Sequence, residues 1–194
     1  MSIWQTLEQA DRLATLEINS WNCAITDPIW ALISDIPVWI PRYVAIVAYI
    51  IYRLGWKKGL IVVGGAILTF AFCDQFSNLI KDATQRLRPL HDAFMLHNGL
   101  NVLENGGKYS FFSAHAANAF GLATSTLIGL RSATGEKYSK YASGMYTWAF
   151  FVAVSRIFVG KHFLGDVIVG TCVGLAAGWT FGSLAKQAIL KYCK

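Results

Sequence analysis

The sequence predicts an all-α fold: a polytopic membrane bundle of about five transmembrane helices, preceded by an N-terminal interfacial helix. Of the 194 residues, 55% are hydrophobic and only 14% are charged, whereas soluble domains contain roughly 25% charged residues. Apolar stretches long enough to cross a bilayer recur along the chain. Seven Trp and eight Tyr residues suit the aromatic belts at the two membrane surfaces. A chain of this length is expected to form one domain, residues 1–194.

The N-terminal segment differs from the rest of the chain in its hydrophobicity. Residues 3–22 mix apolar and polar side chains in an irregular helical pattern and are too polar to span a membrane. We therefore expect residues 1–25 to form a helix that lies in the membrane interface. Five spans are predicted to follow, at about residues 29–54, 59–80, 113–131, 141–160 and 163–185.

The second and third spans are joined by residues 82–112, the longest connection in the chain. Its part 90–108 is partly apolar, and the sequence leaves open whether it shapes lipid entry or only packs on the surface. The last span carries a glycine at every fourth position, Gly170, Gly174, Gly178 and Gly182. Such a stripe predicts close approach of another helix.

The formal net charge is +6, but the basic residues are scattered rather than gathered in a stripe. A nucleic-acid partner is therefore not expected, and anionic lipid together with a phosphate site explains the charge better. The loops at the two ends of the spans carry nearly equal numbers of Lys and Arg. Three of these residues, Lys81, Arg88 and Arg156, are interpreted below as binding a ligand, so we leave them out of the count. Lys and Arg are then more numerous at the other end of the spans, where they are Arg53, Lys57, Lys58, Arg131, Lys137, Lys140, Lys186, Lys191 and Lys194. The positive-inside rule then places those residues in the cytoplasm.

Charged residues at the ends of the apolar segments are the first functional signal. A charge at membrane depth costs roughly 2.5–3.5 kcal/mol on insertion scales, so such residues are functional candidates. Lys81 and Arg88 are seven positions apart, which places them on one helix face two turns apart. Pro89 biases Arg88 away from helical geometry, so the helix is expected to end there. The alternative for these residues alone is a basic stretch at the lipid headgroups.

A second candidate segment is Ser113-Ala114-His115, directly before an apolar helical run. A serine in this position is typical of a helix start. Free backbone N–H groups at a helix N-terminus can bind an anion, and a small residue lets the ligand approach. The alternative is a capping serine followed by an interfacial histidine.

A third segment contains Ser155-Arg156 followed by His162 and Asp166. One helical turn separates the histidine from the aspartate, so the carboxylate can accept a hydrogen bond from one ring nitrogen. This bond fixes the tautomer and makes the other ring nitrogen a better nucleophile. Isolated His-x-x-x-Asp pairs are usually structural, but an arginine six residues before this one favours a site for an anionic phosphate.

Together the three segments match a known pattern in order. The sequence resembles the membrane branch of the type 2 phosphatidic acid phosphatase superfamily, whose motifs are K-x6-R-P, P-S-G-H and S-R-x5-H-x3-D. These motifs align with residues 81–89, 112–115 and 155–166, and the first and third match fully. The second has Phe112 and Ala114 in place of the motif's Pro and Gly. The resemblance covers roughly residues 55–185, which we expect to be the catalytic core.

The resemblance implies roles for these residues. The residue that matches His162 attacks phosphorus and gives a phosphohistidine, which water then hydrolyses. Asp166 would orient His162, and His115 would protonate the leaving group and then act as base toward water. The phosphate oxygens would be held by the three cations, the Ser113 hydroxyl and the Ala114 N–H, namely by Lys81, Arg88, Arg156, Ser113 and Ala114. No metal or other cofactor is implied, because phosphoryl transfer needs mostly positioning and charge stabilisation.

Two further polar residues lie near these motifs. Asn118, three residues after His115, could form a hydrogen bond into the site or simply pack between helices. Asp74 shares a helix face with Lys81 and could pair with it or with another cation.

The expected function is hydrolysis of a phosphate ester or pyrophosphate of an envelope lipid in a bacterial inner membrane, with the site facing the periplasm. The Ser-Ala-His-Ala-Ala-Asn sequence is similar to lipid A phosphatase-like members, which places lipid A phosphate slightly ahead of undecaprenyl pyrophosphate and phosphatidylglycerol phosphate. Two alternatives are not phosphatases. Facing histidines His115 and His162 could bind haem, and the same cations could serve a non-catalytic lipid or anion transporter. The sequence leaves the oligomeric state open.

Overall fold

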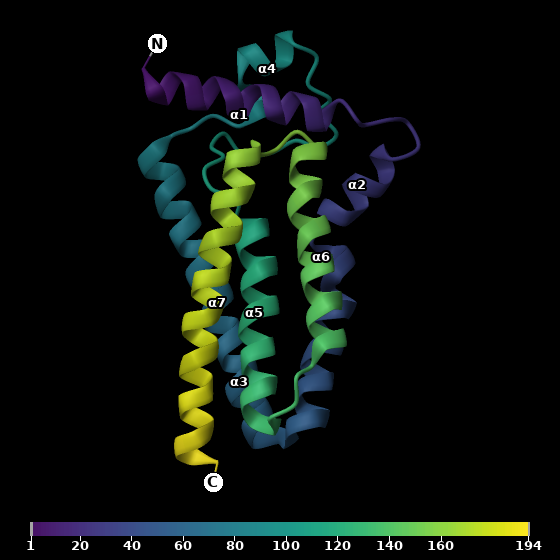
Figure 1. The fold of residues 1–194 in the computed structure, drawn as a ribbon. Helices are drawn as coiled ribbons and strands as arrows, with labels where there is room; N and C mark the ends of the chain where they lie inside the picture. Colours follow the sequence, from purple (N-terminus) through teal and green to yellow (C-terminus); the bar gives the residue numbers. More distant parts are fainter. Residues whose placement is uncertain (1, 194) are drawn as a thin grey trace.

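A computed structural model of the chain describes residues 2–193 and has the predicted all-α fold. Four long helices run along the bundle (Figure 1), namely α3 (Ile40–Thr84), α5 (Ala114–Thr134), α6 (Ser139–Phe158) and α7 (Leu164–Tyr192). Helix α1 (Ile3–Asn19) lies across one end of the bundle, and the short helix α4 (Ala93–His97) lies beside it at the same end. Within residues 2–193 the only β pairing is an isolated bridge between Leu87 and Tyr109.

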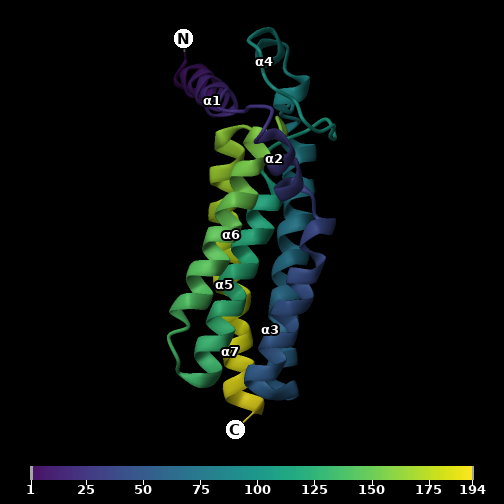
Figure 2. The same cartoon turned by 90° about the vertical axis from the view of Figure 1, so that its right-hand side faces the viewer.

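Helix α3 contains the first two predicted spans, folded back on each other. It is interrupted at Gly55, whose φ is 72° and ψ is 166°. A Cβ placed on Gly59 would lie only 3.0 Å from the Cα of Ile51, which a straight helix rising 1.5 Å per residue could not bring about. The two arms therefore form a tight helical hairpin at the end of the bundle opposite α1, which Figure 2 shows from the side.

The predicted first span, 29–54, was wrong as a single helix. The structure has a separate helix α2 (Asp27–Ser34), a 3-10 turn η1 (Pro37–Trp39) and then the first arm of α3. The reason is Pro37, which has no N–H to continue the helical hydrogen bonds and whose ring clashes with the carbonyl four residues earlier; the helix stops at Ser34, and Asp35 is extended, with φ −82° and ψ 121°. Helix α2 instead packs against α6, where Trp30 stacks on Phe158 with ring centroids 4.1 Å apart.

The other predicted spans correspond to observed helices with somewhat different ends. The second continues to Thr84, the third occupies α5, the fourth α6, and the fifth extends in α7 to Tyr192. Two segments, Pro37–Thr84 and Leu164–Tyr192, are long and apolar enough to cross a membrane. Helix α5 is the central helix, because it contacts α3, α6 and α7 and buries most of its residues.

The glycine stripe of the last span packs against α5, as predicted. A Cβ on Gly174 would lie 2.2 Å from the carbonyl oxygen of Ala117, and one on Gly178 would lie 2.6 Å from that of Gly121. Any side chain there would push the two helices apart. These glycines allow α5 and α7 to approach closely, which places the start of α5 beside the start of α7.

Helix α1 is fixed to the bundle by its polar face. The Asn19 amide group donates to the carbonyl oxygens of Ile157 and Phe158 at the end of α6. At the start of α7, Thr15 accepts a hydrogen bond from the Leu164 N–H and Asp11 accepts one from the Gly165 N–H. Large apolar side chains near the start of α1, including Ile3, Trp4 and Leu7, are exposed, and Trp4 and Leu7 line a groove together with Asp11. A helix in this segment was thus correctly predicted; it is shorter than residues 1–25 and lies over the turn between α6 and α7.

Candidate active site

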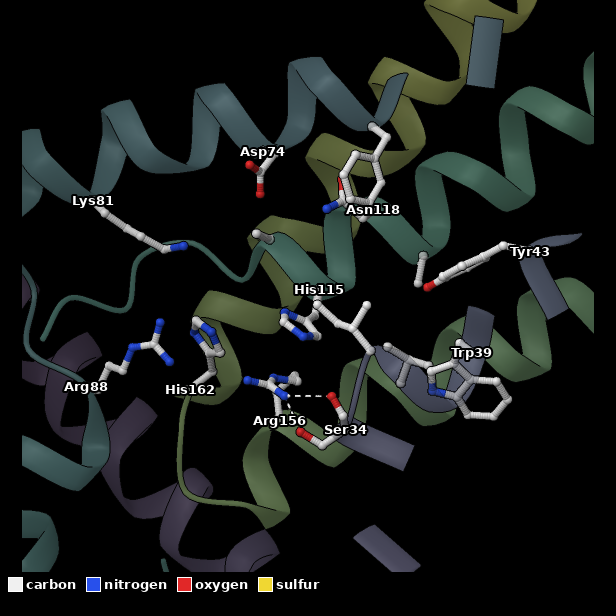
Figure 3. A pocket seen from close by; sticks show the side chains of 15 residues that line it. Ser34, Trp39, Tyr43, Asp74, Lys81, Arg88, His115, Asn118, Arg156 and His162 are labelled. Carbon is white, nitrogen blue, oxygen red and sulfur yellow. Dashed lines mark hydrogen bonds between the residues drawn. The ribbon is translucent and has the colours of Figure 1, made fainter. Parts of the chain in front are cut away.

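A cavity of about 210 Å³ lies near the end of the bundle that α1 crosses. Its walls come from α3, α5 and α6, from the turn after α6, and from the end of α2 with η1 (Figure 3). Eight of the ten predicted site residues line it: Asp74, Lys81, Arg88, Ala114, His115, Asn118, Arg156 and His162. The other two, Ser113 and Asp166, do not line the cavity. The structure therefore brings the three sequence motifs together around one space.

His162 lies in the turn between α6 and α7, and a glycine makes this turn possible. Gly160 has φ +77°, and a Cβ there would lie 3.0 Å from the Asn101 carbonyl oxygen. The turn is closed by the backbone N–H groups of Lys161 and His162, which both donate to the Arg156 carbonyl oxygen at 3.1 Å. The position of the imidazole is thus tied directly to that of Arg156.

The predicted pairing of His162 with Asp166 is present. Nδ1 of His162 lies 3.3 Å from Oδ2 of Asp166, and the imidazole is only 2% exposed. Burial lowers the pKa of His162 to about 4, despite the nearby carboxylate, which acts to raise it. A neutral imidazole whose Nδ1 is bound to a carboxylate leaves Nε2 with a free lone pair, which is the state that a nucleophile requires.

Asp166 is itself held by residues that the sequence did not predict. Its Oδ1 accepts a hydrogen bond from Nη1 of Arg86 at 2.7 Å, and its Oδ2 accepts one from the Phe163 N–H at 3.0 Å. Arg86 also donates from Nη2 to Asp11 of α1 at 2.6 Å, and its guanidinium lies 4.1 Å from the centre of the Phe163 ring. Burial works against the charge of Arg86, but Asp166 and Asp11 outweigh it and raise its pKa.

Arg156 supplies hydrogen-bond donors to the cavity. Its side chain is 3% exposed, and its Nη1 contacts both the hydroxyl and the carbonyl oxygen of Ser34. Its Nε is buried and has no partner among the described residues. A buried donor without an acceptor costs about 1–3 kcal/mol, so an anion bound here would satisfy it.

Lys81 and Arg88 approach the cavity from the other side (Figure 3). Lys81 is in the last turn of α3, but the helix ends at Thr84, four residues before the predicted end at Arg88. Gln85 has φ 50° and Arg88 is extended, so the prediction that Lys81 and Arg88 share one helix face was wrong, although both reach the cavity. Nε of Arg88 donates to the Tyr109 carbonyl oxygen at 2.9 Å. This bond orients the guanidinium and leaves its two terminal amino groups for a ligand.

The second motif behaves partly as predicted. Ser113 is the N-cap of α5 and accepts a hydrogen bond from the Ala116 N–H at 3.4 Å, while its own N–H donates to the Asp166 carbonyl oxygen. The hydroxyl thus has a structural partner, and its contact with phosphate stays a prediction. Ala114 is the first residue of α5 and lines the cavity, which is where an anion can meet free N–H groups at a helix start.

Asp74 and Asn118 also line the cavity, but neither has the partner that the sequence suggested. Asp74 forms no ion pair within 4.0 Å with Lys81 or any other cation in the described part of the chain. The side-chain oxygen of Asn118 is buried without a hydrogen-bond partner among these residues.

Comparison with known proteins decides the family. Residues 58–189 match the profile of the PAP2 superfamily. The chain belongs to this superfamily. It is 30% identical over 177 residues to a lipid A 4'-phosphatase of Porphyromonas gingivalis, covering 88% of this chain and 70% of that one. It is 28% identical over 188 residues to a lipid A 4'-phosphatase of Bacteroides thetaiotaomicron, covering 93% and 79%.

Two solved PAP2 structures share the fold. The phosphatidylglycerolphosphate phosphatase of Bacillus subtilis has a TM-score of 0.72 at 20% identity, covering 96% of this chain and 89% of that one. Aquifex aeolicus LpxE has a TM-score of 0.62 at 22% identity, covering 87% and 92%. The chain is therefore a membrane lipid phosphatase of the metal-independent class predicted from the sequence, and this favours a phosphatase over the haem and transporter alternatives.

Proposed function

We propose that this PAP2 protein removes a phosphate monoester from lipid A in the bacterial inner membrane, with the cavity open to the periplasm. The names of the two similar curated proteins support this substrate. The excess of Lys and Arg at the hairpin end of the bundle, away from the cavity, supports this orientation. Undecaprenyl pyrophosphate and phosphatidylglycerol phosphate are the alternative substrates. They carry different groups next to the reacting phosphorus, so an assay of phosphate release can distinguish them.

The first step is attack by Nε2 of His162 on phosphorus. The N–P bond forms while the bond from phosphorus to the lipid oxygen breaks, and His115 gives its proton to that departing oxygen. Asp166 holds Nδ1 of His162 throughout, so the imidazole keeps its orientation when it becomes charged. The lipid leaves as an alcohol, and the phosphoryl group stays on His162.

The second step returns the enzyme to its starting state. His115, now neutral, takes a proton from a water molecule, whose oxygen attacks phosphorus as the N–P bond breaks. Inorganic phosphate is released and His162 recovers its lone pair. During both steps the equatorial oxygens carry developing charge, which Lys81, Arg88 and Arg156, the three cations that line the cavity, can bind.

One observation carries the proposal: a buried neutral imidazole backed by Asp166 shares a cavity with three cations, one of which has an unpartnered buried donor. The test is phosphate release by the protein purified in detergent, with lipid A, undecaprenyl pyrophosphate and phosphatidylglycerol phosphate as substrates. The proposal predicts the highest kcat/KM for lipid A. A preference for undecaprenyl pyrophosphate would refute the substrate, and no release from any lipid would refute the activity.

A further inference from the structure

The cavity is larger than a phosphate group requires. Its volume of about 210 Å³ corresponds to roughly seven water molecules at about 30 Å³ each, whereas a phosphate has four oxygens. The catalytic groups Lys81, Arg88 and His162 lie toward one side, as Figure 3 shows. The rest of the wall contains two polar residues of α3 and α5 and several apolar or aromatic ones, namely Asp74, Asn118, Ile36, Trp39, Tyr43 and Phe70.

This second part of the cavity presents hydrogen-bond acceptors that the protein does not satisfy. The Asp74 carboxylate points into the cavity from α3 (Figure 3) and has no cation within 4.0 Å in the described chain. The buried oxygen of Asn118 has no donor there either. The indole N–H of Trp39, which lines the same cavity, does not serve them, because it donates to the Ile33 carbonyl oxygen at 2.8 Å. A ligand that placed O–H or N–H groups here would remove the cost of the unsatisfied Asn118 oxygen and would give the Asp74 carboxylate a hydrogen-bond donor.

The charges in the cavity indicate how much negative charge the ligand carries. Three cations, Lys81, Arg88 and Arg156, and one carboxylate, Asp74, line it. The other nearby carboxylate, Asp166, is compensated by Arg86 behind the cavity wall. Counting these side chains, and setting aside the proton that His115 delivers to the leaving group in the first step, the lining has a net charge of +2, which balances a phosphate monoester of about −1.5 to −2 at pH 7. A diphosphate would add negative charge beside the Asp74 carboxylate, which repels it.

We propose that Asp74 and Asn118 form a hydroxyl-binding subsite for the sugar or polyol unit that carries the phosphate. Asp74 accepts a hydrogen bond from a hydroxyl close to the phosphorylated carbon, and Asn118 accepts a second from a hydroxyl or amide N–H. The subsite rests on the proposed function and sharpens it: the substrate is a monoester on a hydroxyl-bearing carbon skeleton rather than a polyprenyl diphosphate. Lipid A, a phosphorylated sugar lipid, belongs to this class.

The test compares a matched pair of substrates, 1-acylglycerol 3-phosphate and its 2-deoxy analogue, which differ in a single hydroxyl. The wild-type protein should hydrolyse the hydroxyl-bearing lipid with the higher kcat/KM. In Asp74→Ala the ratio of the two kcat/KM values should fall about tenfold, because one hydrogen bond to a charged acceptor is lost. Asn118→Ala should lower the same ratio by a smaller factor, and this second variant tests the subsite independently if Asp74→Ala does not fold.

Asp82→Asn is the matched control. Asp82 is exposed near the same end of α3, so its replacement removes the same charge outside the cavity and should leave the ratio at the wild-type value. With undecaprenyl pyrophosphate, Asp74→Ala should raise the rate relative to the monoester, because a repelling charge is gone. If Asp74→Ala and Asn118→Ala leave the substrate ratio unchanged, the subsite is refuted while the phosphatase proposal stands. If the wild-type protein hydrolyses neither lipid nor lipid A, the proposed function fails as well.

Discussion

Two carboxylates near the cavity have opposite surroundings. Asp166 is fully buried and receives hydrogen bonds from Arg86, His162 and the Phe163 N–H. Asp74 lines the cavity and has no ion-pair partner in the described chain. A carboxylate that receives hydrogen bonds from the protein can hold a catalytic side chain in one orientation. A carboxylate without such partners is free to accept hydrogen bonds from a ligand. The difference separates the residues that build the site from those that select its substrate.

The arginines show the same contrast. Arg86 is engaged on both sides, by Asp166 and by Asp11, and is stacked on Phe163. Arg156 contacts Ser34 through one amino group, but its buried Nε has no partner in the described chain. We therefore expect Arg86 to act through Asp166 and Arg156 to act on the substrate directly.

The largest expected effect is the loss of the nucleophile. His162→Ala should lower kcat by roughly 10⁴-fold or more, as removal of a covalent nucleophile does in other hydrolases. Phosphate release from lipid A measures the loss. The control is His91→Ala, since His91 is exposed in the turn η2 (Pro89–His91) and its loss should leave the rate at the wild-type level. Substantial turnover in His162→Ala would remove this residue as the nucleophile.

Arg156→Ala should have the next largest effect. Removing a donor aimed at the developing charge costs about 10²–10³-fold in kcat, and kcat should fall more than KM rises. Ser34→Ala, which removes only the hydroxyl that contacts Arg156, should cost much less. Equal losses in the two variants would mean that Arg156 is held mainly for packing.

Arg86→Gln tests the role of Asp166, the carboxylate that receives hydrogen bonds from the protein. Without Arg86 the full charge of Asp166 acts on His162 and raises the pKa of the imidazole, so the neutral nucleophile is lost at a higher pH. We expect the acid limb of the kcat/KM–pH profile to move to higher pH, with a loss of about tenfold at neutral pH, and Arg86→Lys should partly restore both. A loss of rate with an unmoved acid limb would show that Arg86 is only structural.

The low pKa of His162 also predicts how stability depends on pH. The folded-state value is about 4, below about 6.5 for an exposed histidine, so the unfolded chain binds the proton first. As pH falls from about 6.5 to 4, the free energy of unfolding should therefore fall, by at most about 1.4 kcal/mol per pH unit from this residue. Melting temperatures in detergent measure the slope, which should become shallower in His162→Gln. An identical slope in that variant would contradict a buried neutral imidazole.

The smallest expected effect concerns metal removal. The three cations already occupy the places from which a metal ion would act on phosphate oxygens, so EDTA should leave the rate of phosphate release unchanged. Vanadate, which imitates trigonal-bipyramidal phosphorus, should inhibit in the same assay. Strong inhibition by EDTA would indicate a metal-assisted hydrolase.

The sequence predicted the parts of the site that lie within motifs. Lys81, His115 and His162 belong to short sequence patterns, and the structure gathers them around one cavity as expected. The helix face predicted for Lys81 and Arg88 was wrong, because α3 ends between them. Ser34 could not be found this way, because its position depends on the break before Pro37 and on the packing of α2 against α6. A predicted core of residues 55–185 therefore leaves out part of the cavity wall.

Arg86 and Asp11 were missed for a related reason. They are 75 positions apart in sequence, and only the crosswise position of α1 over the turn between α6 and α7 brings them together. The one available signal was a second arginine, Arg86, between Lys81 and Arg88 in the first motif. Its partner could not be inferred from spacing, since long-range contacts depend on how the helices pack.

The most direct test is to trap the covalent intermediate. The wild-type protein is mixed with lipid A and quenched in alkali, where phosphohistidine survives, and the phosphorylated peptide is identified by mass spectrometry. We predict phosphate on His162 in the wild-type protein and none in His162→Ala. Phosphate on another residue, or turnover without any phosphorylated protein under these conditions, would contradict the account.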